Sequence, residues 1–381
     1  MKILDRLTRR VGALALAAGL ALSLSACGGT PAAPSPSPAA AAPSASPAAA
    51  SPDASDTYVL EDMAGREVEV PKQVDTVMSL HPVPTYCAWR LGGDKLINVD
   101  ANFSKLYVAD GHISAVDYLT QDAVAELAAL PVTDTWMKGI DPEVVMSMHP
   151  DLILTLTQDT NADKLQEATG IPVFCIVKAP VTEQANSYRL VGKLLGNEEK
   201  GDAMGDMVQG ILDRMDKEVS ALAEADKTTV MFCGKSGDLY GVPGANSVYA
   251  TTLKSGGGVN VSDELAQVDE ESVDVTVEQM MLWDPQAIIC QTVDEQNTLL
   301  TAPEWSGLSA VKNGRVYVPP QYVSCDGTQA VLGIEWVNYI LYHDGDSAYL
   351  EQLHQDMSDF HSLFYDQTLT PEQLDALATG Y

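Results

Sequence analysis

Two stretches of this chain repeat one another, and they constrain its fold more than any other feature of the sequence. Residues 141–159 and 276–294 each contain a short helical pattern, a proline, an apolar run and a polar loop. The matched pairs are Glu143 with Glu278, Met146 with Met281, Pro150 with Pro285, Ile153 with Ile288, Thr157 with Thr292 and Asp159 with Asp294. Because the order of elements repeats along with single residues, the pattern predicts two similar α/β lobes, with the loop after each apolar run facing a shared cleft.

The N-terminal segment is predicted to lie outside the folded protein. Residues 1–26 start with a basic segment and continue with an apolar run at 11–24, which is too short to cross a membrane comfortably. The following stretch, Leu24-Ser-Ala-Cys27, resembles the lipobox of bacterial lipoproteins, which implies a cleaved signal peptide and a lipidated Cys27. An ordinary signal peptide with a chance cysteine is the alternative. Residues 27–56, rich in Ala, Pro and Ser after that cysteine, are predicted to form a tether that buries no apolar surface.

Charge and cysteine content exclude several functions. The formal net charge of −31 argues against a nucleic-acid partner and fits a solvated acidic surface. Beyond Cys27 the chain has five cysteines with no C-x-x-C spacing, so neither a disulfide framework nor a zinc site is predicted. Cys175, Cys233 and Cys290 lie in apolar, strand-like runs, where buried free thiols are expected.

Strand and helix patterns alternate along the folded part and predict parallel sheets covered by helices. Residues 57–181 are predicted to form an N-terminal lobe, 227–345 a C-terminal lobe, and 346–381 two C-terminal helices. Between the lobes, residues 182–226 lack strand patterns, and apolar spacings of three and four predict one long helix from Glu198 to about Ala225. Such a helix would be about 45 Å long and could bridge the lobes.

Turn residues set the local boundaries in the first lobe. A hairpin is predicted at 58–71, with its turn at Ala64-Gly65. A strand at 74–80 is predicted to end in a loop at 81–84, before a helix that starts at Thr85 and is stopped by Gly92-Gly93.

Ligand-binding residues are predicted at the carboxyl ends of the strands, where open parallel α/β sheets bind their ligands. The candidates are His81, Tyr86, Asn102, Phe103, Trp136 and Gln158 in the first lobe, and Ser236, Tyr240, Asn246, Gln291, Tyr322 and Ser324 in the second. Several are aromatic, which favours a bulky and partly apolar ligand, although local packing is the alternative for each ring. The chain has no Gly-x-Ser-x-Gly elbow and no complete phosphate loop, so no catalytic residues are predicted.

Several segments resemble the substrate-binding proteins of ABC transporters for iron–siderophores, haem and vitamin B12. These segments are 77–80 with Leu91-Gly92-Gly93, the helix, proline and strand of 141–154, the glycine-rich 256–260, the run 305–317 and the tail at 364–372. The resemblance covers about residues 58–378. It implies two Rossmann-like α/β lobes with mainly parallel sheets, joined by one long helix, with the ligand cleft between the lobes. It also implies delivery of the ligand to an ABC permease driven by its ATPase.

The same resemblance implies acidic docking residues, since members of this family meet arginines of the permease with one acidic cluster in each lobe. Asn161-Ala-Asp163 stands where the vitamin B12 binder has Asn-Ala-Glu, which indicates Asp163. The internal repeat adds Asp294 and Glu295 in the second lobe. Ordinary surface carboxylates are the alternative.

The sequence therefore predicts a monomeric lipoprotein, anchored to the cell membrane on the extracytoplasmic side by lipid alone, that delivers an iron chelate or related metal complex to an ABC importer. No enzymatic activity, cofactor or resident metal is expected. The folded part has few arginines, which disfavours a highly anionic siderophore and leaves haem, a corrinoid or a neutral chelate. His81 and Tyr322 are the candidate ligands for a haem iron. A sensor or chelate-processing enzyme on the same fold, and a binder of free metal ions, stay open as alternatives.

Overall fold

The computed structural model describes residues 56–104, 119–234, 239–245, 247–265, 272–319 and 328–379. The predicted signal peptide, Cys27 and nearly all of the tether lie outside these residues, as do four predicted ligand-binding residues, Ser236, Asn246, Tyr322 and Ser324. No helix within the described ranges is long and apolar enough to cross a membrane. The domain boundaries given above stay a prediction.

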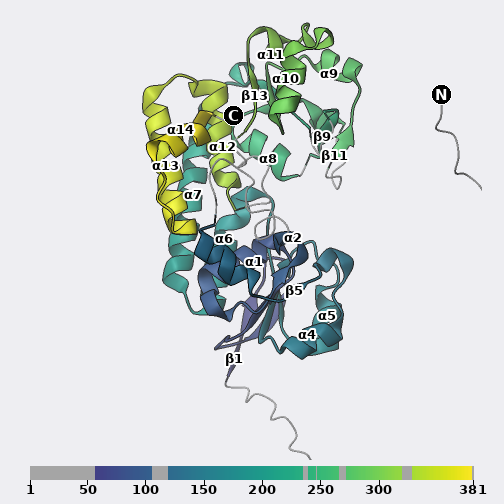
Figure 1. Ribbon diagram of the computed structural model, residues 1–381, viewed down its shortest axis with the longest axis vertical. Coiled ribbons are helices and arrows are strands. Elements are labelled where there is room, and N and C mark those ends of the chain that lie inside the picture. Colours follow the sequence, from purple (N-terminus) through teal and green to yellow (C-terminus); the bar gives the residue numbers. More distant parts are fainter. Residues whose placement is uncertain are drawn as a thin grey trace, which may run out of the picture. The chain divides into compact units, whose positions relative to one another are not determined.

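The sheet of the N-terminal lobe is parallel, as predicted (Figure 1). Its strands β3 (Val77–Ser79), β6 (Leu152–Leu156) and β7 (Val173–Ile176) pair in that order. A second parallel pair, β4 (Val99–Asp100) and β5 (Val132–Thr133), meets β3 through a bridge between Val77 and Leu96.

The predicted hairpin is also confirmed, as β1 (Thr57–Glu61) and β2 (Glu67–Pro71). Its turn contains Gly65 at φ 76°, a left-handed conformation that glycine adopts without steric strain.

Short helices accompany this sheet in the described residues, and a 3-10 turn at Gly93–Lys95 follows the first of them. They are α1 (Pro82–Gly92), α2 (Ala101–Phe103), α3 (Gln121–Ala128), a 3-10 turn at Trp136–Lys138, α4 (Pro142–Met148) and α5 (Ala162–Thr169). The loop predicted at 81–84 is wrong, because α1 already begins at Pro82. Proline suits the first helical turn, where its missing N–H is not needed, and the His81 side chain caps the helix by accepting a hydrogen bond from the Val83 N–H.

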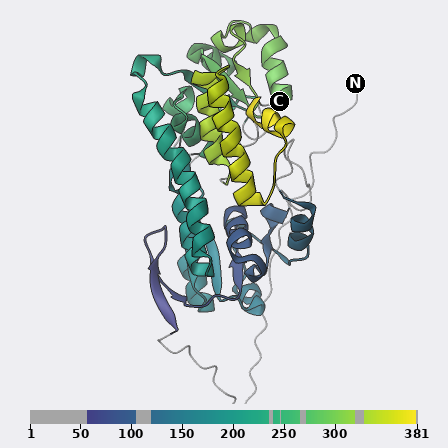
Figure 2. The same cartoon turned by 90° about the vertical axis from the view of Figure 1, so that its left-hand side faces the viewer.

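Two long helices lead from the first lobe to the second. The first, α6 (Gln184–Leu195), packs against α7 (Glu198–Ala221) at a close approach of Gly192 and Gly201, where a Cβ on either residue would overlap backbone atoms of the other helix. Figure 2 shows α7 as the long teal helix. It has 24 residues and is therefore about 36 Å long, shorter than predicted. The helix ends early because the backbone of Leu222 turns to an extended conformation.

The C-terminal lobe repeats the parallel architecture. Strands β10 (Val259–Asn260), β8 (Thr229–Cys233), β12 (Ala287–Cys290) and β13 (Val316–Tyr317) form its sheet in that order, and β9 (Gly241–Pro243) pairs antiparallel with β11 (Ser272–Asp274). Its helices are α8 (Val248–Ser255), α9 (Val277–Trp283), α10 (Val293–Thr301), α11 (Ser309–Lys312) and α12 (Ala330–Asn338), which continues as a π-helical turn at Tyr339–His343. The two predicted C-terminal helices follow, as α13 (Ser347–Tyr365) and α14 (Pro371–Thr379).

The internal repeat is confirmed in three dimensions. In each lobe the repeated helix (α4 or α9) leads into a strand (β6 or β12) that begins two residues after the proline. Both helices end at a left-handed residue that is not glycine, His149 at φ 53° and Asp284 at φ 40°. Asp151 accepts hydrogen bonds from the Thr76 N–H and hydroxyl, and Gln286 accepts the same two bonds from Thr229. Each lobe thus fixes the start of its central strand pair in the same way.

Each sheet has an apolar layer on both faces. Leu152 and Leu154 of β6 belong to the largest hydrophobic cluster, whereas Ile153 faces a smaller cluster with Val145 of α4. The second lobe alternates likewise, because Phe232 joins the largest cluster and Met231 faces Met280 of α9. Sheets that are covered on both faces leave their strand ends as the sites for ligand contact.

The end of α13 makes a second link between the two halves of the chain, in addition to α7. The hydroxyl of Tyr86 on α1 donates to the carbonyl of Phe364, 2.6 Å away. Arg90, also on α1, forms an ion pair with Asp366 just beyond the end of α13. Figure 2 shows this end of the yellow helix beside α1. No local sequence pattern predicts this contact.

Candidate ligand-binding and docking site

The strand ends of each lobe lie at one edge of its sheet. In the first lobe, β3 and β6 run in register with Ser79 opposite Leu154, so the residues that follow them, His81 and Gln158, leave the same edge. In the second lobe, Cys233 lies opposite Cys290, and Gln291 follows directly. The structure therefore brings these predicted residues to the expected strand ends. Their contact with a ligand stays a prediction.

His81 is buried and neutral. Burial, together with the nearby positive charge of Lys178, lowers the pKa of its imidazole to about 3. Its Nδ1 accepts the hydrogen bond from the Val83 N–H, so the proton of the neutral ring lies on Nε2. A protonated ring nitrogen is a hydrogen-bond donor and not a metal ligand. In this conformation His81 serves as a helix cap, which weighs against the role of haem ligand.

Tyr86 and Phe103 are buried in the core, and their contact with a ligand stays a prediction. The hydroxyl of Tyr86 donates to the Phe364 carbonyl. The centre of the Tyr86 ring lies 6.5 Å from that of the Phe364 ring and 5.4 Å from that of the Tyr365 ring. Phe103 is completely buried. Both residues belong to helices that follow a strand, and a helix after a strand end buries one face against the sheet.

A buried polar network supports the edge of the first lobe, and sequence reasoning missed it. The Ser79 hydroxyl lies 2.7 Å from the Thr85 hydroxyl, which donates to the carboxylate of Asp100. Asn98 donates to the Ser79 carbonyl and to the Thr133 hydroxyl. Burial raises the pKa of Asp100, while bonds from the N–H groups of α2 oppose that rise. The network joins β3, β4 and β5 at their carboxyl ends and so fixes the backbone from which Asn102 projects.

Trp136 lines a cavity of about 370 Å³ in the first lobe. The cavity lies between the 3-10 turn, α4 and α5, and its walls include Leu80, Ile140, Asp159, Asn161 and Lys164. The indole N–H of Trp136 is buried and has no hydrogen-bond partner among the described residues. Asp159 shapes the wall, because its carboxylate accepts bonds from the Thr155 hydroxyl and the Asn161 N–H.

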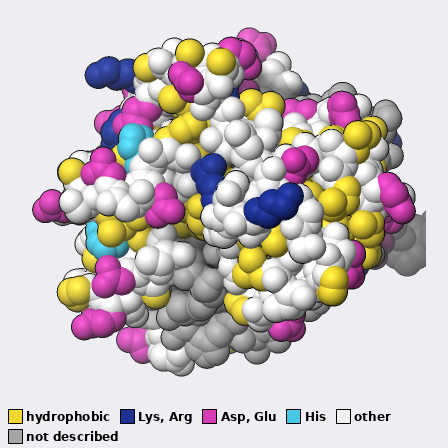
Figure 3. All heavy atoms as spheres, turned by 90° about the horizontal axis from the view of Figure 1, so that it is seen from above, with side chains coloured by type: hydrophobic (Ala, Val, Ile, Leu, Met, Phe, Trp, Pro, Cys, Tyr) yellow, Lys and Arg dark blue, Asp and Glu magenta, His cyan; other side chains and the backbone are white. Residues whose placement is uncertain are grey.

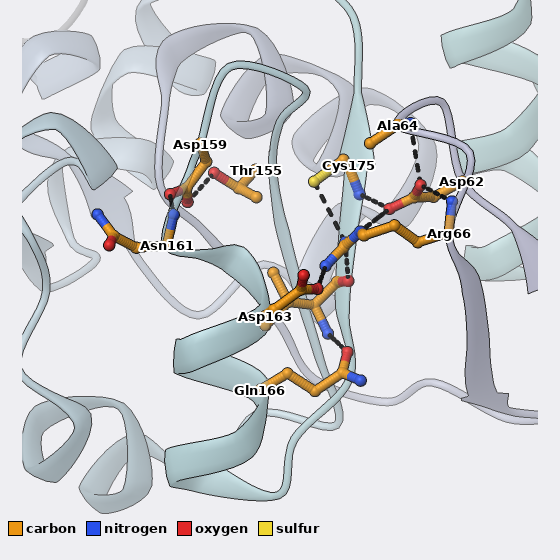
Figure 4. A network of polar contacts seen from close by, with 10 residues as sticks. Asp62, Ala64, Arg66, Thr155, Asp159, Asn161, Asp163, Gln166 and Cys175 are labelled. Atoms are coloured by element: carbon orange, nitrogen blue, oxygen red, sulfur yellow. Dashed lines mark hydrogen bonds and ion pairs between the residues drawn. The ribbon is translucent and has the colours of Figure 1, made fainter.

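Asp163 is exposed and is held by an internal arginine (Figure 4). One nitrogen of Arg66 lies 2.6 Å from the Asp163 carboxylate, and the others reach Asp62 and the Val173 carbonyl. Burial of the guanidinium opposes its charge, but hydrogen bonds to Asp62 and Asp163 raise the pKa of Arg66 above its usual value. The predicted docking carboxylate of this lobe is therefore presented in a fixed position at the first turn of α5.

The two acidic candidates of the second lobe have different roles in the structure. Glu295 forms a capping box with Thr292, since its carboxylate accepts the Thr292 N–H and its own N–H donates to the Thr292 hydroxyl. The same carboxylate lies against Gly234, at φ 90°, where a Cβ would overlap it. Asp294 is exposed in the first turn of α10. Asp294 is thus the carboxylate of this pair that is presented to solvent.

Tyr240 and Gln291 complete the described candidates of the second lobe. Tyr240 is 36% exposed, and its ring lies 6.3 Å from that of the buried Trp305. The side-chain carbonyl of Gln291 is buried without a partner in the described part of the chain. An unpaired buried acceptor at a strand end is a position that a ligand donor could satisfy.

The surface is acidic, and the described side chains form no metal site. The chain has 53 Asp and Glu against 22 Lys and Arg. In Figure 3, acidic side chains lie around the rim of one face, with Lys and Arg in fewer places among apolar side chains. Within the residues that the structure describes, no three His, Cys, Asp or Glu side chains are grouped so that they could hold a metal ion.

Two α/β lobes with parallel sheets, joined by a long helix, define the class of bilobal solute-binding proteins. The sequence model of the periplasmic binding protein family matches residues 65–323, and the chain belongs to this family. The resemblance to ABC-transporter substrate-binding proteins is thereby confirmed, and so is the predicted fold class.

Known proteins similar to this chain agree with the family. An uncharacterized ABC transporter substrate-binding lipoprotein, YvrC of Bacillus subtilis (strain 168), is 24% identical over 75% of this chain and 85% of its own length. A solved ABC transporter solute-binding protein from Sulfurospirillum deleyianum superposes with a TM-score of 0.69 at 21% identity, covering 84% of this chain and 98% of that one. The molybdate-binding MolA of Haemophilus influenzae gives 0.64 at 16% identity, with 82% and 99% covered.

Proposed function

We propose that the protein is an extracytoplasmic lipoprotein that binds a metal chelate, such as a neutral siderophore complex, haem or a corrinoid, and delivers it to an ABC importer. The fold supports a binding role, because the similar proteins above are named as binding proteins. It does not select the ligand. Similar structures include a Fe3+-hydroxamate transport protein from Saccharomonospora viridis and the vitamin B12 binder BtuF of Vibrio cholerae, as well as the molybdate binder.

The choice of ligand rests on one observation, that the arginine side chains are already bound to other groups of the protein. All five arginines beyond residue 56 are engaged with other parts of the protein. Arg66, Arg90, Arg189 and Arg214 each form an ion pair, and Arg315 donates to the carbonyls of Ile340 and Leu341. A tightly held anion such as molybdate or a catecholate complex is usually met by charge-assisted bonds from arginine. Engaged arginines therefore favour a ligand of low negative charge.

The remaining groups at the strand ends suit such a ligand. Trp136 and Tyr240 offer aromatic surface, and the Gln291 carbonyl offers an acceptor. Aromatic surface with a few polar groups is typical of sites that bind bulky, partly apolar molecules. Lys105 and Lys235, which follow two of the strand ends in sequence, lie outside the described residues.

A thermal-shift panel tests this proposal. Purified protein lacking the lipid anchor is heated with cyanocobalamin, haemin, a ferric hydroxamate or molybdate. A ligand at a hundredfold excess over its Kd stabilises the folded state by about 2.7 kcal/mol. We expect one of the three chelates to raise the melting temperature and molybdate to leave it unchanged. A shift with molybdate alone, or with none of the four compounds, would refute the proposed ligand class.

We further propose that Asp163 and Asp294 are the docking carboxylates for the permease. Both lie in the first turn of a helix that follows a repeated strand, and both are exposed. Glu295 is less exposed than Asp163 and Asp294, because its carboxylate caps α10 and lies against Gly234.

A further inference from the structure

Two cysteines face each other at the ligand edge of the second lobe. Cys233 ends β8 and Cys290 ends β12, and the register of the two parallel strands places them directly opposite one another. Their sulfur atoms are 3.8 Å apart, and both side chains are fully buried. The other two described cysteines, Cys87 and Cys175, lie in separate elements, α1 and β7.

The two cysteines are the last residues of their strands, directly before the loops. The Gln291 N–H donates to the Cys233 carbonyl, and Gly234 follows with its left-handed backbone against the Glu295 carboxylate. Both thiols face the cluster that contains Met231 and Ile288, below α9 and α10. The hydrogen bond between the two thiols, together with burial, raises the pKa of Cys290 well above its ordinary value. Both thiols are shielded from solvent in the folded protein.

The geometry of this pair is compatible with a covalent bond. Neighbouring strands lie about 4.8 Å apart, and disulfides form between Cα atoms about 4.4–6.8 Å apart. The sulfur atoms would have to approach to about 2.05 Å, a movement that rotation of the two side chains can supply. The register already places the two residues opposite each other, so the bond would join neighbouring strands without a change of pairing.

We propose that Cys233 and Cys290 are a redox modification site that closes to a disulfide across β8 and β12, beneath the ligand loops of the second lobe. This inference rests on the proposed extracytoplasmic location, where thiols meet an oxidising environment. A thiolate of the pair attacks the disulfide of an oxidised thiol–disulfide oxidoreductase or of a small disulfide, and forms a mixed disulfide. The second cysteine then displaces the carrier. The pair loses two protons and two electrons, and the oxidant's disulfide is reduced, to a dithiol in the oxidoreductase or to two thiol molecules in the case of a small disulfide. Because both thiols are buried in the folded protein, this exchange takes place while the chain folds or in a state in which the strand ends open.

A peptide map of the unreduced protein tests the proposal directly. Trypsin places the five cysteines beyond residue 56 in five separate peptides, with Cys233 in 228–235 and Cys290 in 255–312. Protein refolded in a buffer of oxidised and reduced glutathione is denatured, alkylated and digested. We expect these two peptides to be linked, with a mass lower than their sum by two hydrogen atoms, and to separate on reduction. Alkylated, unlinked peptides, or a link from either one to the Cys325 peptide, would overturn the proposal.

Two variants extend the test to the folded state. The wild-type protein should melt at a higher temperature when oxidised than when reduced. Cys87→Ala, which removes an unrelated buried thiol, should keep this difference, and Cys290→Ala should lose it. An equal difference in all three proteins would contradict the proposed pair. The map and the melting comparison contain no ligand, so failure of the proposed ligand class would leave both results unchanged.

Discussion

At the scale of single residues, several side chains next to the strand ends make hydrogen bonds within the protein, and these bonds occupy groups that could otherwise bind a ligand or a partner. His81 caps α1, Tyr86 holds the end of α13, and Glu295 caps α10. Their position after strand ends indicated His81 and Tyr86 as ligand contacts, and the internal repeat indicated Glu295 as a docking residue. Only the fold shows which side of the backbone each side chain takes. Trp136, Asn102, Gln158, Tyr240 and Gln291 stay candidate ligand contacts within the described residues.

His81→Ala should reduce stability and leave ligand affinity unchanged. Loss of a side-chain cap costs about 1 kcal/mol, and His81→Asn should restore most of it, because asparagine is a strong N-cap residue. Urea unfolding gives the stability, and a ligand titration of the same samples gives the affinity. Weaker binding without loss of stability would instead make His81 a ligand contact.

Gly234→Ala should be more harmful than Gly65→Ala. Both glycines have positive φ, so a side chain adds strain of about 1–2 kcal/mol at either position. At Gly65 nothing lies within 4 Å of the added Cβ, whereas at Gly234 it would overlap the Glu295 carboxylate and disturb the cap of α10. Urea unfolding should show the larger loss for Gly234→Ala. Equal losses would mean that Glu295 moves aside freely.

At the scale of elements, the repeat and the parallel strands could be predicted because each depends on local patterns. Proline, apolar runs and helical spacing lie within about twenty residues of one another in both copies. The contacts that join distant elements could not be predicted in this way. Tyr86 and Phe364 are 278 positions apart, and neither helix pattern shows which partner its apolar face will meet. The early start of α1 was missed for a different reason, since Pro82 and Pro84 read as a loop until the cap from His81 is known.

Three helices meet at a buried carboxyl group that should make stability depend on pH. Arg214 of α7 binds both Glu335 of α12 and Asp356 of α13. Burial, aided by the Asp356 charge and opposed by Arg214, raises the pKa of Glu335 to about 8. The folded state therefore holds this proton more tightly than the unfolded chain. The stabilisation should be complete below the ordinary pKa, about 4.5 in the unfolded chain, and should be lost as the pH rises through 8.

Glu335→Gln tests this linkage, because glutamine keeps the shape of the neutral acid without titrating. Between pH 5 and pH 8.5 the wild-type free energy of unfolding should fall more steeply than that of Glu335→Gln. Glu351→Gln, an exposed change on α13, serves as the control and should follow the wild type. Parallel curves for all three proteins would show that Glu335 does not cause the pH dependence of stability.

At the scale of the whole molecule, the two halves of the chain are tied by α7 and again by the end of α13. Tyr86→Phe removes the hydroxyl that joins α1 to the Phe364 carbonyl, and leaves a buried acceptor without its donor. Such a loss costs about 1–3 kcal/mol. Urea unfolding should show this loss while ligand affinity stays the same, because Tyr86 lies in the core. A large fall in affinity at unchanged stability would instead show that Tyr86 contacts the ligand.

If Asp163 and Asp294 dock to the permease, replacing them should lower uptake of the ligand without weakening its binding. Asp163→Asn combined with Asp294→Asn should lower ligand uptake by cells several-fold, while the purified protein binds ligand as before. Glu351→Gln removes one surface charge away from the repeated loops, serves as the control and should leave uptake unchanged. If the double variant transports normally, the repeated helix starts do not contact the permease.

A spectroscopic titration of the purified protein with haemin, cyanocobalamin and a ferric hydroxamate, with molybdate as a competitor, tests whether the protein binds a metal complex of low negative charge. We predict saturable binding of one chelate at one equivalent per protein, seen as a change in its visible absorbance, with no displacement by excess molybdate. Absence of saturable binding for all three chelates, or displacement of a bound chelate by molybdate, would contradict a site built for a metal complex of low negative charge.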